Sequence, residues 1–307
     1  MKKYLLALLL SSQLFAAYTQ IDGIWYKEEL APTKSVAEHF DEAKALLKKE
    51  NYEEAVRSFL IVVQSFPDTA FFADALYYTG VCYLHIGHLD IADEYFSAYL
   101  NQKGTLKHFE KVFDNKFLIA EKFRQGKRRH PYGIATLPRF ASGKNHAIEL
   151  YDEIAATLPA REIAAKALYC KALLLWKMHE RKEAIEVLQV ITRRFPKHRL
   201  AANSFVRISE IYLNNVEYES QDPDLLSLAQ LNLQSFEKAF PSERRIVEVE
   251  ANLQKMQELY ARALFNTGRF YEKKRKPKAA AIYYRDTIRR YPSTEAAAES
   301  ESKLALR

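Results

Sequence analysis

Residues 184–196 have the sequence AIEVLQVITRRFP, in which a small residue is followed by bulky apolar residues at fixed distances. Leu188 and Ile191 come four and seven positions after Ala184, and Pro196 comes after twelve. Offsets of four and seven place side chains on one face of an α-helix, and a proline beyond the last turn ends that helix. The segment is therefore predicted to be a helix that buries one face against a neighbour.

The pattern occurs six times in the chain, opening at Ala55, Ala92, Ala147, Ala184, Ala229 and Ala280. The interval is 37 residues from the first opening to the second and again from the third to the fourth. In the second copy Gly104 stands where the other copies have proline. Twelve residues before four of the openings lies a second small residue, at Ala43, Gly80, Ala172 and Gly268. Each of these small residues predicts a first helix, and its small side chain would let the second helix, which carries the repeated pattern, approach closely.

Helix pairs with small, aromatic and proline positions in this order resemble the tetratricopeptide repeat. The interval exceeds the usual spacing of about 34 residues, and leucines replace the first-helix tryptophan, as at Leu76, Leu168 and Leu264. The resemblance implies an all-α solenoid of five to six helix pairs. Residues 243–271 are expected to form one long helix. The Ala-, Glu- and Ser-rich residues 293–307 are expected to form the C-terminal capping helix that a solenoid needs for solubility.

The repeats are expected to fall into two groups. Residues 36–144 would hold the N-terminal repeats together with a basic insertion in the third, and residues 145–307 would hold the C-terminal repeats and the cap. A connection as long as this insertion is usually functional or disordered.

The first 17 residues have the features of a secretory signal peptide. Lys2 and Lys3 precede an apolar run over residues 4–10, and small residues follow at Ala16 and Ala17. The apolar run is too short to span a bilayer. We expect cleavage near Ala16 or Ala17 and a periplasmic mature protein, with residues 18–35 as a lead before the repeats.

Residues 14–16 are similar to those that precede the lipidated cysteine of bacterial lipoproteins, but Ala17 stands at the cysteine position. We therefore expect a protein that is not lipidated.

Charge and cysteine content exclude several classes of function. The net charge of +7 is spread along the chain without a basic stripe interleaved with aromatic residues, which argues against nucleic-acid binding. Cys82 and Cys170 fall in different repeats, too far apart for a disulfide. The pair His85 and His88 lacks further ligands at metal-binding spacing. Glycine-rich phosphate loops and hydrolase motifs are missing, so we expect neither enzymatic activity nor a cofactor.

The first helices of tetratricopeptide repeats line a concave groove that binds extended peptides. Carried onto this sequence, the resemblance assigns groove positions to Phe40, Lys44, Leu47, Asp74, Tyr77, Val81 and Leu84. The alternative is that the apolar members of this set, such as Phe40, Val81 and Leu84, belong to the core between helices.

The insertion offers a second candidate surface, a basic cluster of Lys127, Arg128 and Arg129. These cations would meet acidic residues on a partner or anionic headgroups. The alternative for this cluster is a solvated run of charge.

A more specific resemblance covers nearly the whole mature chain. The run from Leu253 through Tyr271 and Tyr284 to Tyr291 and Pro292 looks like the C-terminal end of the BamD family of outer-membrane assembly factors. The resemblance implies a protein peripheral to the outer membrane that binds the barrel-inserting component through its C-terminal repeats. It also implies that unfolded barrel substrates bind at the N-terminal repeats. The alternative is a periplasmic adaptor for cell-wall synthesis, division or polysaccharide export.

Overall fold

The apolar pattern forms helices where the sequence predicts them. The computed structural model describes residues 19–21, 24–26, 31–131, 137–218 and 222–305. The first three helix pairs are α2 (Val36–Lys48) with α3 (Tyr52–Ser65), α4 (Phe71–Ile86) with α5 (Leu89–Leu100), and α6 (Phe109–Arg124) with α7 (Lys144–Thr157). The next three are α8 (Glu162–Lys177) with α9 (Arg181–Arg194), α10 (Arg199–Tyr218) with α11 (Pro223–Ala239), and α12 (Ile246–Lys273) with α13 (Pro277–Arg290).

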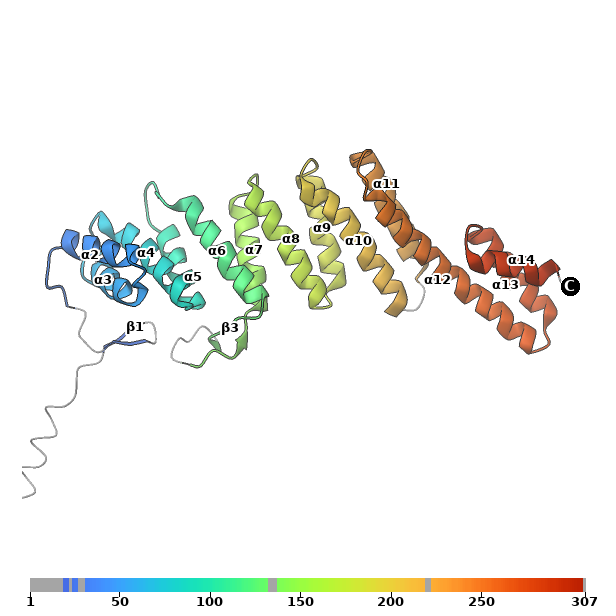
Figure 1. Cartoon of the computed structure of the whole chain (residues 1–307), viewed down its shortest axis with the longest axis horizontal. Coiled ribbons are helices and arrows are strands. Elements are labelled where there is room, and N and C mark those ends of the chain that lie inside the picture. The colour runs from blue at the N-terminus through green and yellow to red at the C-terminus, as the bar shows by residue number, and fades with distance from the viewer. Residues whose placement is uncertain (1–18, 22–23, 27–30, 132–136, 219–221, 306–307) are drawn as a thin grey trace, which may run out of the picture. The chain divides into compact units, whose positions relative to one another are not determined.

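The expected solenoid of helix pairs is confirmed, and Figure 1 shows the pairs following one another within each part of the chain. The predicted long helix is α12, and the predicted cap is α14 (Glu295–Ala305), which packs on α13 and α12. The predicted signal peptide lies outside the described residues. In the lead that follows it, β1 (Thr19–Ile21) pairs antiparallel with β2 (Ile24–Tyr26).

The chain forms two compact units, residues 1–167 and 168–307, which divide within α8. The division expected from the sequence, between residues 144 and 145, lies at the start of α7. Because α7 packs against α6, the third helix pair stays whole in the first unit. Within the described residues no helix is long and apolar enough to cross a bilayer.

Each second helix buries the face that the pattern defines. The side chains at Ala55, Phe59 and Val62 are all 0% exposed, and the corresponding residues of α5, α7, α9 and α13 are buried in the same way. In α11 the opening Ala229 and Phe236 are buried, and Leu233 packs against the hydrophobic cluster that contains Phe236.

Two glycines of the first helices lie directly under an aromatic ring. A Cβ atom on Gly80 would be 2.8 Å from the ring of Phe96, and one on Gly268 would be 2.6 Å from the ring of Tyr284. The small residue twelve positions before the opening therefore lets the second helix approach, as the pattern predicts.

In four of the pairs the two helices are joined by a tight turn with one residue in the left-handed region. Glu50, Gly87, His179 and Arg275 occupy this position, with φ between 56° and 92°. The amide of the next residue then donates to a carbonyl five positions back, as in the bond of 3.1 Å from Asn51 to Leu46. Satisfying a free carbonyl at the helix end in this way is a usual means of stopping a helix.

Side-chain caps mark the start of α2 and of α11. At α2 the Ser35 and Glu38 side chains form a reciprocal capping box with each other's backbone amides. Asp222 caps α11, which begins with Pro223.

Candidate functional site

The seven predicted groove residues do not share one environment. Tyr77 and Leu84 are only 7% and 6% exposed, so their side chains belong to the core and do not offer a surface to a peptide. Tyr77 stacks on the ring of His108 with the centroids 4.1 Å apart. The core alternative therefore holds for Leu84, and the assignment of Tyr77 to the groove surface is wrong.

The other five residues are half-buried: Phe40, Lys44, Leu47, Asp74 and Val81. Asp74 lies with one carboxylate oxygen 3.5 Å from Nε2 of His108. Burial lowers the pKa of His108, although the carboxylate of Asp74 opposes that shift. That these five residues bind a peptide stays a prediction.

Tyr78 is the aromatic residue that the sequence analysis missed. Its ring is half-buried and lies 6.1 Å from the ring of Phe40 and 5.5 Å from that of Phe59. The Nζ atom of Lys44 sits 3.7 Å above the centre of the Tyr78 ring, a cation–π contact. Phe40, Lys44 and Tyr78 thus form a mixed aromatic and cationic surface on α2 and α4, which we call the N-terminal surface.

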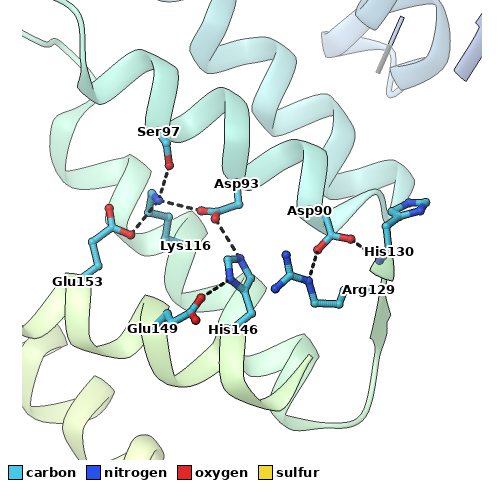
Figure 2. Close-up of polar contacts among 9 residues, drawn as sticks. All are labelled: Asp90, Asp93, Ser97, Lys116, Arg129, His130, His146, Glu149 and Glu153. Carbon is cyan, nitrogen blue, oxygen red and sulfur yellow. Dashed lines mark hydrogen bonds and ion pairs between the residues drawn. The ribbon is translucent and has the colours of Figure 1, made fainter. Parts of the chain in front are cut away.

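The basic insertion is held against the second repeat. Arg128 and Arg129 form β3, which pairs antiparallel with β4 (Ala141–Ser142). Figure 2 shows Asp90 of α5 between Arg129 and His130. One oxygen of Asp90 accepts the backbone N–H of His130 at 2.7 Å, and the other lies 3.3 Å from Nε of Arg129.

This arrangement changes what the basic cluster can do. Arg129 is engaged with a carboxylate of its own chain, while Lys127 and Arg128 are exposed. Arg128 in addition donates to the backbone oxygen of Phe140 at 2.7 Å. Partner binding by this cluster stays a prediction, and Lys127 and Arg128 are the members whose exposure suits it.

Replacing Asp90 with alanine is expected to loosen the insertion. A charge-assisted bond of this kind contributes about 1.5–3 kcal/mol, so cleavage by trypsin after Arg128 and Arg129 should accelerate roughly tenfold or more. Limited proteolysis with mass spectrometry measures the rate, and Asp68→Ala, an exposed aspartate, is the matched control. An unchanged rate would mean that the β3–β4 pairing holds the insertion without Asp90.

A buried lysine joins α5, α6 and α7 beside the insertion. The side chain of Lys116 is 1% exposed, and its ammonium bonds Asp93 at 2.7 Å, Ser97 at 2.9 Å and Glu153 at 2.9 Å. Figure 2 shows Asp93 and Ser97 of α5 and Glu153 of α7 converging on the nitrogen of Lys116, which α6 carries. Three acceptors match the three N–H groups of an ammonium, so the buried charge is fully bonded.

His146 extends this network toward solvent. Its two ring nitrogens lie 3.1 Å from Asp93 and 2.9 Å from Glu149, so both carboxylates fit a doubly protonated ring. Burial by itself would lower the pKa of His146, but the bonds to Asp93 and Glu149 raise it above its ordinary value of 6.5. Burial would likewise raise the pKa of Asp93, but the bond from His146 and the charge of Lys116 lower it.

The raised pKa gives a pH-dependent contribution to stability. Folding favours the protonated ring of His146, so this ring adds to the free energy of unfolding. The added stability is fully present below the unfolded-state pKa of about 6.5, and it is lost as pH rises through the higher folded-state pKa. The wild type should therefore be better protected against hydrogen exchange than His146→Gln, and this difference should be largest in mildly acidic buffer. Hydrogen exchange of α5–α7 peptides across a pH series measures it, with the exposed His85 changed to Gln as the control. A difference that grows with pH would contradict the assignment.

The second unit carries a groove that could bind a partner. A groove of about 710 Å³ is lined by Leu173, Trp176, Lys177, His179, Arg181 and Asn214. The guanidinium of Arg207 lies 4.8 Å from the centre of the Trp176 ring. Tryptophan and arginine at a groove are the residue types that most often dominate protein–protein binding energy. The sequence analysis did not single out Trp176, although it is one of only two tryptophans in the chain.

A smaller groove of about 370 Å³ lies over α9, α10 and α11. Leu228 and Leu231 on its wall are 43% and 58% exposed. The second unit therefore offers apolar side chains at two grooves.

Both cysteines are free thiols. Burial raises the pKa of Cys82 to about 12, so it is unreactive at neutral pH. Among the described residues no group of His, Cys, Asp and Glu side chains could hold a metal ion.

Comparison with solved structures finds weak similarities, one of them to a tetratricopeptide-repeat protein. YrrB, described as having an unusual peptide-binding site, is 14% identical, with 71% of this chain and 92% of that chain covered and a TM-score of 0.38. MamA from Desulfovibrio magneticus RS-1 is 17% identical over 68% of this chain and 97% of that chain, with a TM-score of 0.36. PilF of Pseudomonas aeruginosa is 14% identical, with 87% of this chain and 97% of that chain covered and a TM-score of 0.32. No curated protein sequence matches the chain significantly.

Family models give the closer assignment. A tetratricopeptide-repeat model matches residues 40–105, and the YfiO model, described as an outer membrane lipoprotein, matches residues 143–305. The lipoprotein description does not support the expectation of an unlipidated chain, which rests on Ala17 outside the described residues. Because the second match covers just over half of the sequence, the chain belongs to the YfiO family, and it is a BamD-like tetratricopeptide-repeat protein.

Proposed function

We propose that this protein is a non-enzymatic scaffold of the outer-membrane β-barrel assembly machinery, located in the periplasm at the inner face of the outer membrane. Tetratricopeptide-repeat families are in general protein-interaction modules. The observation that carries the proposal is the groove around Trp176, which lies within the segment matched by the family model. This groove would receive a segment of the barrel-inserting membrane protein.

The N-terminal surface would receive the other class of partner, unfolded barrel substrates. Barrel strands alternate apolar and polar residues and are rich in aromatic side chains at their ends. An extended segment of this kind could place an aromatic ring beside Phe40 and Tyr78 and an acidic group near Lys44. The half-burial of these three residues supports the proposal, since each retains surface for a ligand.

Cross-linking and affinity purification from the protein's own envelope test the scaffold role. The wild type should recover a transmembrane barrel-assembly protein, and Trp176→Ala should reduce its recovery at least about tenfold, as expected for a central anchor residue. Val247→Ala, which truncates an apolar residue of α12 that is 66% exposed, is the matched control and should recover the partner normally.

Recovery of cell-wall or polysaccharide enzymes in place of the barrel-assembly protein would overturn the proposal. The chain would then serve as a periplasmic adaptor for those pathways. Equal losses with Trp176→Ala and Val247→Ala would move the partner site away from this groove.

A further inference from the structure

The outward face of α13 carries a row of cations with one apolar residue among them. Lys278, Ile282, Arg285 and Arg289 are spaced by four, three and four residues, so they lie on one face of the helix. All four are exposed, and Ile282 is 61% exposed. The opposite face of α13 is the one that buries Ala280, Tyr284 and Thr287.

The turn before α13 continues the positive charge. Four exposed cations follow one another there: Lys273, Lys274, Arg275 and Lys276. We call these residues together with the outward row of α13 the basic α13 surface. The left-handed conformation of Arg275 brings the chain round from α12 into α13, so the turn adjoins the end of α13 at which the row begins with Lys278.

Neighbouring acids offset only part of this charge. Glu272 accepts hydrogen bonds from Tyr284 at 2.9 Å and pairs with Lys303 at 3.2 Å. Asp286 lies 2.5 Å from Arg289 and 3.5 Å from Arg290. Lys278 and Arg285, together with the four cations of the turn, therefore give the surface a strong excess of positive charge.

We propose that the basic α13 surface docks on a bilayer that contains anionic phospholipids. Clusters of four to eight Lys and Arg residues are the usual recognition element for such membranes. Arginine binds phosphate through paired N–H groups, which suits Arg285 and Arg289 to lipid headgroups. Ile282 stands in the middle of the row and would reach the boundary between headgroups and acyl chains, as apolar residues of interfacial helices do.

A bilayer fits this surface better than an acidic protein segment does. The cations lie along the outward face of a helix and around a turn, and this geometry is suited to an extended charged plane. The family to which the chain belongs is described as an outer membrane lipoprotein, and a member of such a family would lie next to a bilayer. The inference goes beyond the scaffold proposal and does not depend on the groove around Trp176.

Vesicle co-sedimentation of the full chain purified from its own envelope tests the inference. Vesicles of phosphatidylethanolamine with phosphatidylglycerol are compared with vesicles of phosphatidylcholine alone, at low and at high salt. Each cation near an anionic surface strengthens binding roughly fivefold. Losing two cations should therefore weaken binding of the pair Lys278→Glu and Arg285→Glu to phosphatidylglycerol vesicles at least about 25-fold at low salt. High salt should remove most of the wild-type binding.

The matched control changes net charge equally in the first unit. Lys48→Glu with Lys103→Glu reverses two exposed cations there and should leave vesicle binding close to that of the wild type. Ile282→Ser should weaken binding severalfold without altering its dependence on salt.

Three outcomes would overturn the inference. They are equal binding to phosphatidylcholine vesicles, equal losses with the control pair, and loss of a protein partner with the α13 variants while vesicle binding persists. Because the vesicles contain no protein, failure here would leave the scaffold proposal standing.

Discussion

Replacing Lys116 with methionine is expected to lower the unfolding free energy of the first unit by about 3 kcal/mol, because it breaks a buried ion pair from one side. The ammonium of Lys116 bonds Asp93 and Glu153, and without it these two carboxylates would face each other across the space that it left. Methionine keeps the length of the side chain, so lost packing contributes little to the effect. Protonated His146 would compensate in part, so the loss should be greater at alkaline pH.

Hydrogen exchange of α5–α7 peptides localises this loss to the first unit. The control is Lys111→Met, which removes an exposed cation from the same helix and should change protection very little. A double variant with Asp93→Leu should recover part of the stability, since it replaces the pair by apolar groups. Equal protection in Lys116→Met and Lys111→Met would show that the buried network adds no stability.

Gly268→Leu is the second change for which we expect a large effect. A Cβ atom at this position would already lie 2.6 Å and 2.8 Å from two ring atoms of Tyr284. The ring is 0% exposed, and its hydroxyl bonds Glu272, so it cannot turn aside without losing that bond. Overpacking of this kind typically costs about 1–3 kcal/mol, while removing a helical glycine returns about 1 kcal/mol, so we expect a net loss of up to about 2 kcal/mol.

Asn266→Leu is the control for this change, because it adds a leucine at an exposed position of the same helix. It should leave the stability of the α12–α13 pair unchanged within about 0.5 kcal/mol. Combining Gly268→Leu with Tyr284→Ala should cost less than the sum of the two single changes, since the leucine then fills the space of the ring. Strict additivity would show that the ring does not limit the residue at position 268.

The fold could be predicted because its determinants are local. The pattern from Ala184 to Pro196 fixes one helix, its buried face and its end within thirteen residues. The first helix of a pair is marked by a small residue, such as Gly80 or Gly268, which lies only twelve positions before the alanine that opens the pattern of the second helix. From α2 to α7 and from α9 to α14 each helix contacts the next along the chain, so the periodicity carries most of the architecture within each unit.

The candidate sites were less accessible from sequence. A helix turns by about 100° per residue, so a shift of one position exchanges the core residue Tyr77 for the half-buried Tyr78. The charged partners of Lys116 lie on two other helices, 23 residues away at Asp93 of α5 and 37 away at Glu153 of α7. Such pairing leaves no local pattern, and only the folded chain brings these charges together.

The tight turns within the helix pairs bear on how the chain folds. Gly80 meets Phe96 only sixteen residues later, and the same separation joins Gly268 to Tyr284. Closing loops this short costs little chain entropy, so several pairs can nucleate independently and grow by adding neighbours. Low contact order of this kind is associated with rapid folding, which reduces the time that an unfolded chain spends exposed to aggregation and proteolysis.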